Sequence, residues 1–290
     1  MNPILQFFHN VITLNGTYNW AYVWKYLFAV DIMQGVIMTV VLAVLAQLIG
    51  SLIGLLLYFL RRSNNGFIRW LAERYIWLFR GTPLLVQVLF LNALLPYIGL
   101  SRPLASIKIF QALGFALPTP FDSFLAGLAA LALNEGAYMA EIVRAGIDAI
   151  DVGQLEAAKS LGMTYGLAMR RVVLPQAMRV IIPPLGNEFN SMLKSTSLLS
   201  VISVYETLDI AQGHGATLFA PLELLTVASV WYIALTTVWG FIQSIIERRL
   251  NASSLDTIPN ERSWARRAFG IGRVFGGGPE LPVPVPVDHR

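Results

Sequence analysis

The chain has 290 residues, of which 56% are hydrophobic and only 13% are charged, with a net charge of +4. This balance differs from that of soluble domains and indicates an integral membrane protein. The sequence holds no cysteine, no GxxxxGK[ST] phosphate-binding loop and no metal-ligand spacing among its three histidines, which excludes disulfides, thiolate chemistry and an ATPase site of its own.

Residues 1–30 are rich in aromatic side chains and asparagine, and the first basic residue is Lys25. They therefore lack the basic region that precedes the apolar core of a cleaved signal. The segment contains four aromatic residues typical of membrane interfaces, Trp20, Tyr22, Trp24 and Tyr26. We expect an uncleaved external segment at the membrane interface, with a disordered tail as the alternative.

Residues 35–60 carry no charge and exceed the roughly 20 residues needed to cross a bilayer, so they predict the first membrane span. Gly50 and Gly54 form a small-xxx-small pair that would let a neighbouring helix approach closely.

The second predicted span combines residues 75–79 with residues 84–95. Between the two parts stands Arg80-Gly81-Thr82-Pro83, which predicts a basic anchor and a backbone break. Three prolines in residues 101–122 then predict an external connection that lies along the membrane surface.

The third predicted span begins at Phe124 and becomes polar toward its end. Asn134, Tyr138 and Glu141 share one face of a helix, and this stripe must face protein or water. Glu141, Arg144 and Asp148 stand three and four residues apart, which predicts a structural ladder of intrahelical ion pairs.

A polar loop follows at residues 148–175. Its residues predict two short helices divided by Gly162, with the second resuming at about Thr164. Leu155, Ala158 and Gly162 share one face of the first helix, which predicts a small-residue surface suited to docking.

The fourth predicted span covers residues 175–193 and contains Pro183-Pro184, which predicts a broken helix of the kind that transporters use to build binding sites. A helix kinked for packing alone is the alternative. Residues 195–209 alternate apolar and hydroxyl side chains and predict an amphipathic or re-entrant piece near the outer face. Residues 224–246 carry no charge and predict the fifth and last span.

Residues 251–290 are rich in glycine and proline and predict a disordered cytoplasmic tail. The predicted organisation is thus an external segment at 1–30, a membrane domain at 31–250 and this tail. Seventeen of the 21 Lys and Arg residues lie in 61–80, 144–179 and 248–290. Five spans agree with this distribution if the amino terminus is outside and the carboxyl terminus is in the cytoplasm.

The loop carries Glu156-Ala157-Ala158, then Gly162, then Val172-Val173-Leu174-Pro175. This spacing resembles the cytoplasmic coupling ("EAA") loop of permease subunits in ATP-binding cassette (ABC) importers. Further stretches are similar to the branch that takes up polar amino acids: RGTPLLVQ at 80–87, AYMAEIVR at 137–144, LPQA at 174–177 and KSTSLL at 194–199. The resemblance covers roughly residues 31–250.

The resemblance implies an all-α integral membrane permease of about five transmembrane helices, with a cytoplasmic coupling helix in the EAA loop. That helix would seat in a groove of an ATPase subunit, with Gly162 allowing close approach and Pro175 starting the next helix. The implied coupling residues are Glu156, Ala157, Ala158, Gly162 and Pro175.

The resemblance also implies the partners: two ATPase subunits, a second permease copy or a paralogue, and an extracytoplasmic solute-binding protein. ATP and Mg²⁺ would bind the ATPase subunits, so this chain would hold no cofactor and would not be an enzyme. It would take up a polar amino acid across a bacterial inner membrane by alternating access.

Polar and ionisable residues inside the spans are candidates for the substrate path, since a charge at the bilayer centre costs about 2.5–3.5 kcal/mol. The candidates are Gln87, Asn92, Asn134, Glu135, Asn187, Glu188 and Asn190. We expect Glu188 to accept an ammonium or a cationic side chain. For each residue the alternative is an inter-helix hydrogen bond or ion pair.

The alternative function is an ion-coupled secondary carrier of amino acids, which would also explain Glu135 and Glu188 inside the membrane. Such a carrier needs an internal repeat and no docking loop, and the sequence shows no repeat. An intramembrane hydrolase has neither a GxSxG elbow nor an HExxH motif to support it.

Overall fold

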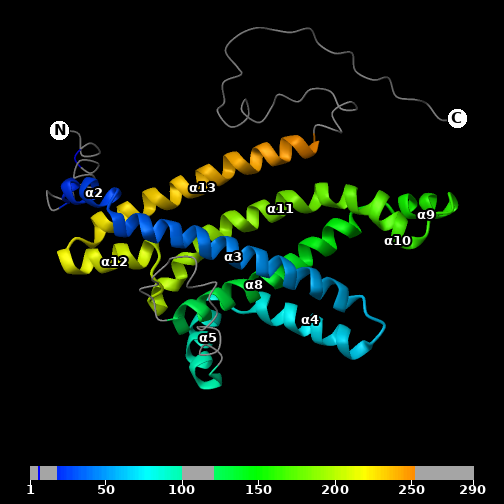
Figure 1. The fold of residues 1–290 in the computed structure, drawn as a ribbon, viewed down its shortest axis with the longest axis horizontal. Helices are drawn as coiled ribbons and strands as arrows, with labels where there is room; N and C mark the ends of the chain where they lie inside the picture. Colours follow the sequence, from blue (N-terminus) through cyan, green and yellow to red (C-terminus); the bar gives the residue numbers. More distant parts are fainter. Residues whose placement is uncertain (1–5, 7–17, 100–120, 252–290) are drawn as a thin grey trace, which may run out of the picture. The chain divides into compact units, whose positions relative to one another are not determined.

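The structure is a computed structural model that describes residue 6, residues 18–99 and residues 121–251. The regular structure of these residues is helical, in agreement with the all-α prediction (Figure 1). The predictions for residues 1–17, for the connection at 101–120 and for the tail beyond residue 251 lie outside the described residues.

Two helices of the described chain are each long and apolar enough to cross a membrane. They are α3 (Val30–Arg61) and α13 (Pro221–Asn251), and they confirm the predicted first and last spans. A short helix, α2 (Trp20–Leu27), precedes α3 and packs its buried side chains against the start of α13. The Trp231 indole on α13 donates a hydrogen bond of 2.8 Å to the carbonyl of Leu27.

The predicted second span is two helices, α4 (Gly66–Gly81) and α5 (Leu84–Ile98), which meet at an angle of 110°. The break lies at Thr82-Pro83, as predicted. Pro83 has no N–H to continue α4, and it holds Thr82 in an extended conformation, so the chain changes direction before α5 begins.

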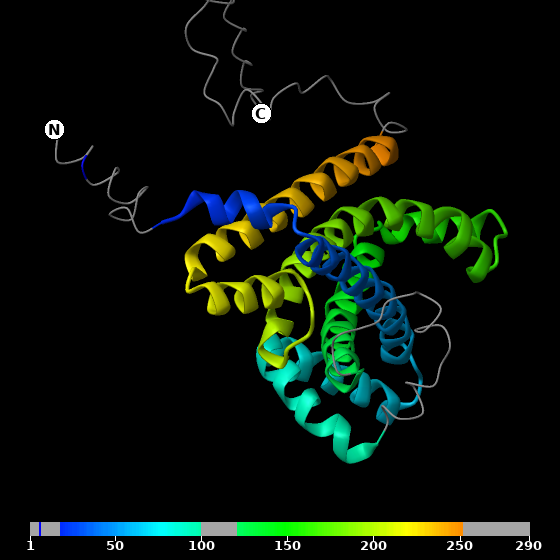
Figure 2. The ribbon, with the colours of Figure 1, turned by 60° about the vertical axis from the view of Figure 1, so that its left-hand side comes forward.

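The long helix α8 (Phe121–Asp148) lies where the third span is predicted, and it contacts α3, α4, α5 and α11. Its approach to α3 is very close. A Cβ atom on Gly54 would lie 2.3 Å from the Cβ of Met139, and one on Gly50 would lie 2.6 Å from the Cβ of Glu135. The predicted small-residue seam on α3 is therefore occupied by α8, which runs beside it (Figure 2).

The loop after α8 forms α9 (Val152–Ser160) and α10 (Tyr165–Ala168), separated at Gly162 as predicted. From α10 the helix continues through a wide π-helical turn (Met169–Val173) into α11 (Leu174–Ser195). Pro175 is the second residue of α11, where the prediction places it, but a separate helix start is absent because the π-helical turn joins α11 to α10. In the wide turn the N–H of Leu174 bonds to the carbonyl of Met169, and this geometry makes room for the ring of Pro175 inside a continuous helix.

The predicted break of α11 at Pro183-Pro184 is also absent. A proline removes the hydrogen bond to the carbonyl four residues earlier, and here those carbonyls belong to Arg179 and Val180. Both residues are exposed, so the adjacent prolines disturb one turn of the outer surface and the helix continues.

Side chains of α13 bind the same stretch of α11 from the other side. The Trp239 indole donates to the Gly186 carbonyl at 2.8 Å, and Gln243 Nε2 donates to the Pro183 carbonyl at 3.3 Å. After α11 the chain forms a short 3-10 helix (Thr196–Ile202) and then α12 (Thr207–Leu218).

The close approach of α3 and α8 predicts that Gly54→Ala is destabilising, because Met139 Cβ and the Ala140 backbone leave no space for a methyl group. We expect a loss of about 1–3 kcal/mol, typical of overpacking. Gly240→Ala in α13 is the matched control, since a Cβ there meets no atom within 4 Å. Thermal unfolding in detergent would measure both, and equal midpoints for the two variants would contradict the prediction.

Candidate functional site

The turn between α9 and α10 is a helix C-cap centred on Gly162. Its N–H bonds to the Lys159 carbonyl at 2.9 Å, and the Met163 N–H bonds to the Ala158 carbonyl at 3.1 Å. This Schellman arrangement requires a left-handed residue at its centre, and Gly162 has φ +81°. An added Cβ would meet no atom of the chain, so within the subunit the glycine serves the turn and not a close approach.

The exposed face of α9 is not the one that the sequence indicated. Ala158 is only 4% exposed and packs inside the chain. Leu155, on the same face, lines a pocket of about 310 Å³ together with Tyr165 of α10 and other residues. The small residues of α9 allow another segment to pack closely against it. That segment is the following part of the same loop. The side chains that point outward include Val152 and Leu161, which are 68% and 84% exposed.

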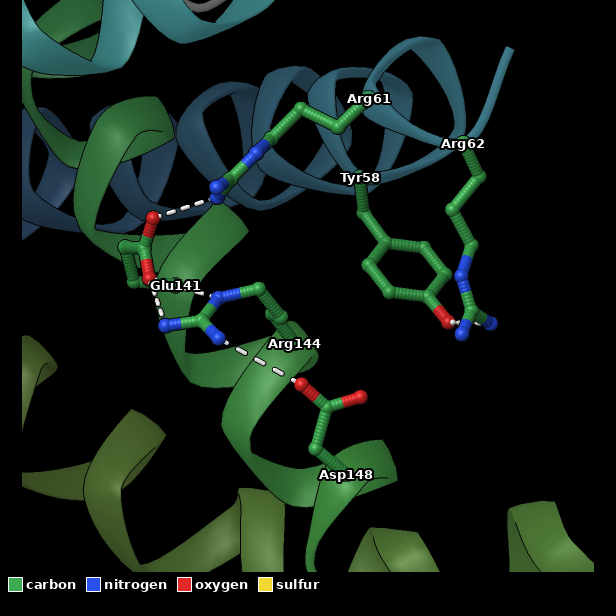
Figure 3. A network of polar contacts seen from close by, with 6 residues as sticks. All are labelled: Tyr58, Arg61, Arg62, Glu141, Arg144 and Asp148. Atoms are coloured by element: carbon green, nitrogen blue, oxygen red, sulfur yellow. Dashed lines mark hydrogen bonds and ion pairs between the residues drawn. The ribbon is translucent and has the colours of Figure 1, made fainter. Parts of the chain in front are cut away.

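A charged network joins α3 to α8 just before this loop (Figure 3). The predicted ladder is present: Arg144 bonds to Glu141 at 2.7 Å and to Asp148 at 3.4 Å. Arg61, at the end of α3, also bonds to Glu141 at 2.5 Å. No sequence pattern indicates Arg61, because it lies 80 residues from Glu141 and only the packing of α3 on α8 brings it near. The network fixes the end of α3 to the helix that leads into α9.

Gln87 and Asn134, two predicted substrate-path residues, meet at the bend between α4 and α5. Gln87 Nε2 lies 2.9 Å from the Phe79 carbonyl and 3.0 Å from the Thr82 carbonyl. Asn134 Nδ2 donates to the same Phe79 carbonyl and to Gln87 Oε1, each at 3.0 Å. Both amides therefore satisfy carbonyls that the end of α4 leaves without helical partners.

Charged residues from three helices gather beside this bend. Glu188 on α11 lies within electrostatic range of Arg80 on α4 and of Glu135 on α8. The Arg80 guanidinium also lies over the ring of Tyr138, 5.4 Å from its centre. Glu135 itself is buried and accepts a hydrogen bond of 2.9 Å from Gln47 on α3. The predicted stripe on α8 thus contacts protein, at Arg80 and at the amides of the bend.

The other predicted polar residues of α11 are placed differently. Asn187 Oδ1 accepts from Gln243 Nε2 at 3.0 Å, which joins it to α13. Asn190 Oδ1 is buried and has no hydrogen-bond partner among the described residues. The structure therefore pairs Gln87 with Asn134 and places Glu188 within electrostatic range of Glu135, whereas the amide of Asn187 binds α13.

The helical core and the loop with two short helices agree with the membrane subunit that the sequence predicted. Residues 46–252 match the family "Binding-protein-dependent transport system inner membrane component". The chain belongs to this family, and it is a permease subunit of an ABC importer, as its sequence predicted. These matches give no support to the ion-coupled carrier.

Similar proteins include the arginine transport system permease protein ArgU of Corynebacterium glutamicum, which is 40% identical over 78% of this chain and 70% of its own length. The arginine permease ArtQ of Bacillus subtilis is 38% identical over 63% of this chain and 76% of its own. A crystal structure of an amino acid ABC transporter with histidines has 38% identity, covers 80% of this chain and 99% of its own, and has a TM-score of 0.66. The methionine transporter MetNI shares the fold at 17% identity, with a TM-score of 0.57 over 76% of this chain and 96% of its own.

The hydrogen bonds at the bend predict that Gln87→Met destabilises the subunit. Methionine leaves the Thr82 carbonyl without this donor and removes the Gln87 acceptor of Asn134, and an unsatisfied buried group costs about 1–3 kcal/mol. Asn92→Leu on the same helix is the control, because Asn92 makes no hydrogen bond within the described residues. Thermal unfolding of the purified subunit should show a lower midpoint for Gln87→Met alone; a similar drop in both variants would rule out a special role for the bend.

Proposed function

We propose that this subunit carries a polar amino acid with a cationic side chain. The observation that carries the proposal is the approach of Glu188 and Arg80 beside the break between α4 and α5. An amino acid needs acceptors for its ammonium and donors for its carboxylate, and this pair offers one of each. Neither side chain is buried, and the names of two similar permeases, ArgU and ArtQ, refer to arginine.

The remaining predicted path residues have supporting places in this proposal. Gln87 and Asn134 hold the bend that positions Arg80, and Asn190 offers a buried oxygen without a partner on the helix that carries Glu188. Asn187 and Glu135 are linked to α13 and α3. Uptake then proceeds by alternating access, in which an external binding protein delivers the substrate and rigid-body motion opens the path.

The proposed orientation places the loop in the cytoplasm and the amino terminus outside. It rests on the distribution of Lys and Arg, most of which lie at the Arg61 end of α3, in the loop and after α13. In this orientation the charged network around Glu141 lies at the cytoplasmic ends of α3 and α8.

The proposed docking surface for the ATPase subunit is the outward face of α9 and its turn. Val152, Glu156, Ala157 and Leu161 are exposed there, while Ala158 packs beneath them and fixes α9 to its own chain. The continuous helix that contains Pro175 begins just beyond the turn and leads into the membrane.

Two ATPase subunits would bind ATP and Mg²⁺, so in this proposal the permease chain itself binds no cofactor and performs no hydrolysis. A second permease, either another copy or a paralogue, would complete the path. The family supports these assignments, since it implies ATPase and solute-binding partners.

Gly162→Val should uncouple the subunit. A side chain at positive φ costs about 1–2 kcal/mol, and a β-branched side chain costs more. The population of the turn in its docking conformation should therefore fall roughly tenfold. Uptake and substrate-stimulated ATPase activity should fall while the amount in the membrane is unchanged. Gly162→Asn is the control, since asparagine tolerates this conformation. Normal transport by Gly162→Val would exclude the coupling role.

Glu188→Gln should weaken the binding of a cationic substrate. A charge-assisted hydrogen bond contributes about 1.5–3 kcal/mol, which corresponds to a rise in KM of roughly tenfold or more. Glu73→Gln on α4 is the matched control. Uptake of labelled arginine into proteoliposomes would measure both variants, and an unchanged KM and specificity for Glu188→Gln would remove Glu188 from the site.

A further inference from the structure

Glu206 shows how this chain satisfies a buried carboxylate. It is fully buried at the start of α12 and accepts from the N–H groups of Leu208 and Asp209 at 2.8 and 2.9 Å. Its other oxygen accepts from the Tyr232 hydroxyl at 2.5 Å and from the Thr39 hydroxyl at 3.3 Å. Four donors surround the group, so its negative charge is compensated by hydrogen bonds from three directions.

Glu135 is almost as deeply buried, but its surroundings are poor in donors. It is 3% exposed, and within the described residues it accepts a single hydrogen bond, from Gln47 Nε2 at 2.9 Å. Gln47 is 7% exposed, and its own Oε1 is buried with no partner in that part of the chain. The backbone of Gly50 closes the site, since even a Cβ there would lie 2.6 Å from Glu135.

With Glu135 ionised, the Gln47–Glu135 pair therefore has one hydrogen-bond donor too few. With Nε2 turned toward Glu135, Gln47 Oε1 has no donor. If the amide is turned over, Oε1 faces the carboxylate, and two acceptors oppose each other. In the turned-over arrangement a proton on Glu135 removes this opposition, because a carboxylic acid donates a hydrogen bond to the amide oxygen and a carboxylate does not.

The neighbouring charges favour the same state. Glu188 on α11 is the ionisable group that acts on Glu135, and it has the same sign. The nearby cation, Arg80 on α4, acts on Glu188. An ionised Glu135 would thus be a buried charge facing a second carboxyl without a cation of its own, which is costly inside a membrane.

We propose that Gln47 and Glu135 form a proton-binding site between α3 and α8, in which Glu135 is a neutral carboxylic acid that donates its hydrogen to Gln47 Oε1. The ligand is a proton, and the acid–amide pair joins the two helices beside Gly50, where their backbones approach closely. This site does not depend on the identity of the transported substrate.

Infrared spectroscopy tests this protonation state directly. The full chain, assembled with its ATPase partner in lipid nanodiscs, would be compared with Glu135→Gln at neutral pH, where an exposed glutamate is ionised. The difference spectrum should contain the carbonyl band of a protonated carboxyl that shifts in D2O. Glu73→Gln on α4 is the control and should retain this band. A difference spectrum with only carboxylate bands would overturn the proposal.

A second variant tests the hydrogen bond to Gln47. In Gln47→Leu the Glu135 proton loses its acceptor, so the carbonyl band of wild type should move to higher wavenumber. A band that does not move places the proton elsewhere and contradicts the pair. Because Glu135→Gln is nearly isosteric and an amide also pairs with Gln47, we expect it to remain folded and assembled. If it unfolds, the wild-type band and its shift in Gln47→Leu still decide the question.

Discussion

The packing of α3 against α8 is the constraint on which the rest of the subunit depends. Gly50 and Gly54 let the two backbones approach to a distance at which even a Cβ atom would clash. This distance brings Gln47 to Glu135 in the middle of the helices and Arg61 to Glu141 at their ends. Without it, a buried carboxyl and a buried amide would lose each other as partners. A membrane helix pair gains little from apolar burial, so close packing and hydrogen bonds must supply its stability.

Polar side chains in this protein work mostly at places where the helical backbone is interrupted. Gln87 and Asn134 satisfy carbonyls at the bend between α4 and α5, and Glu206 satisfies the first N–H groups of α12. Trp239 and Gln243 reach from α13 to carbonyls near the two prolines of α11. Each group replaces water that the membrane cannot supply. The polar residues of the spans therefore include structural ones, and Glu188 and Arg80 stand apart because neither is used in this way.

The sequence predicted what local chemistry determines. Long uncharged stretches predicted α3 and α13, and helix propensity together with one glycine predicted the two helices of the loop. Residue spacing predicted the ion pairs from Glu141 to Asp148. Prediction from the sequence failed where contacts between distant parts of the chain determine the structure. Proline indicated breaks at Pro83 and Pro183 alike, but the chain bends at the first and continues through the second.

The candidate site was predictable only in part for the same reason. Ala158 and its neighbours formed a small-residue face whose partner proved to be the same chain, because a periodic pattern identifies a packed face and not what packs there. Glu135 and Glu188 stood out as charges inside spans, whereas their link to Gln47 and Arg80 required three helices to be placed in space.

The uninterrupted path from Tyr165 to Ser195 has a mechanical consequence. With two prolines inside it and a wide turn before Pro175, the stretch is one continuous helical rod, roughly 45 Å long at 1.5 Å per residue. A tilt of about 5° at the loop would displace the far end of such a rod by about 4 Å. A small movement at one surface of the membrane would thus move the opposite end of the helix by a distance comparable to the width of a water molecule or a side chain.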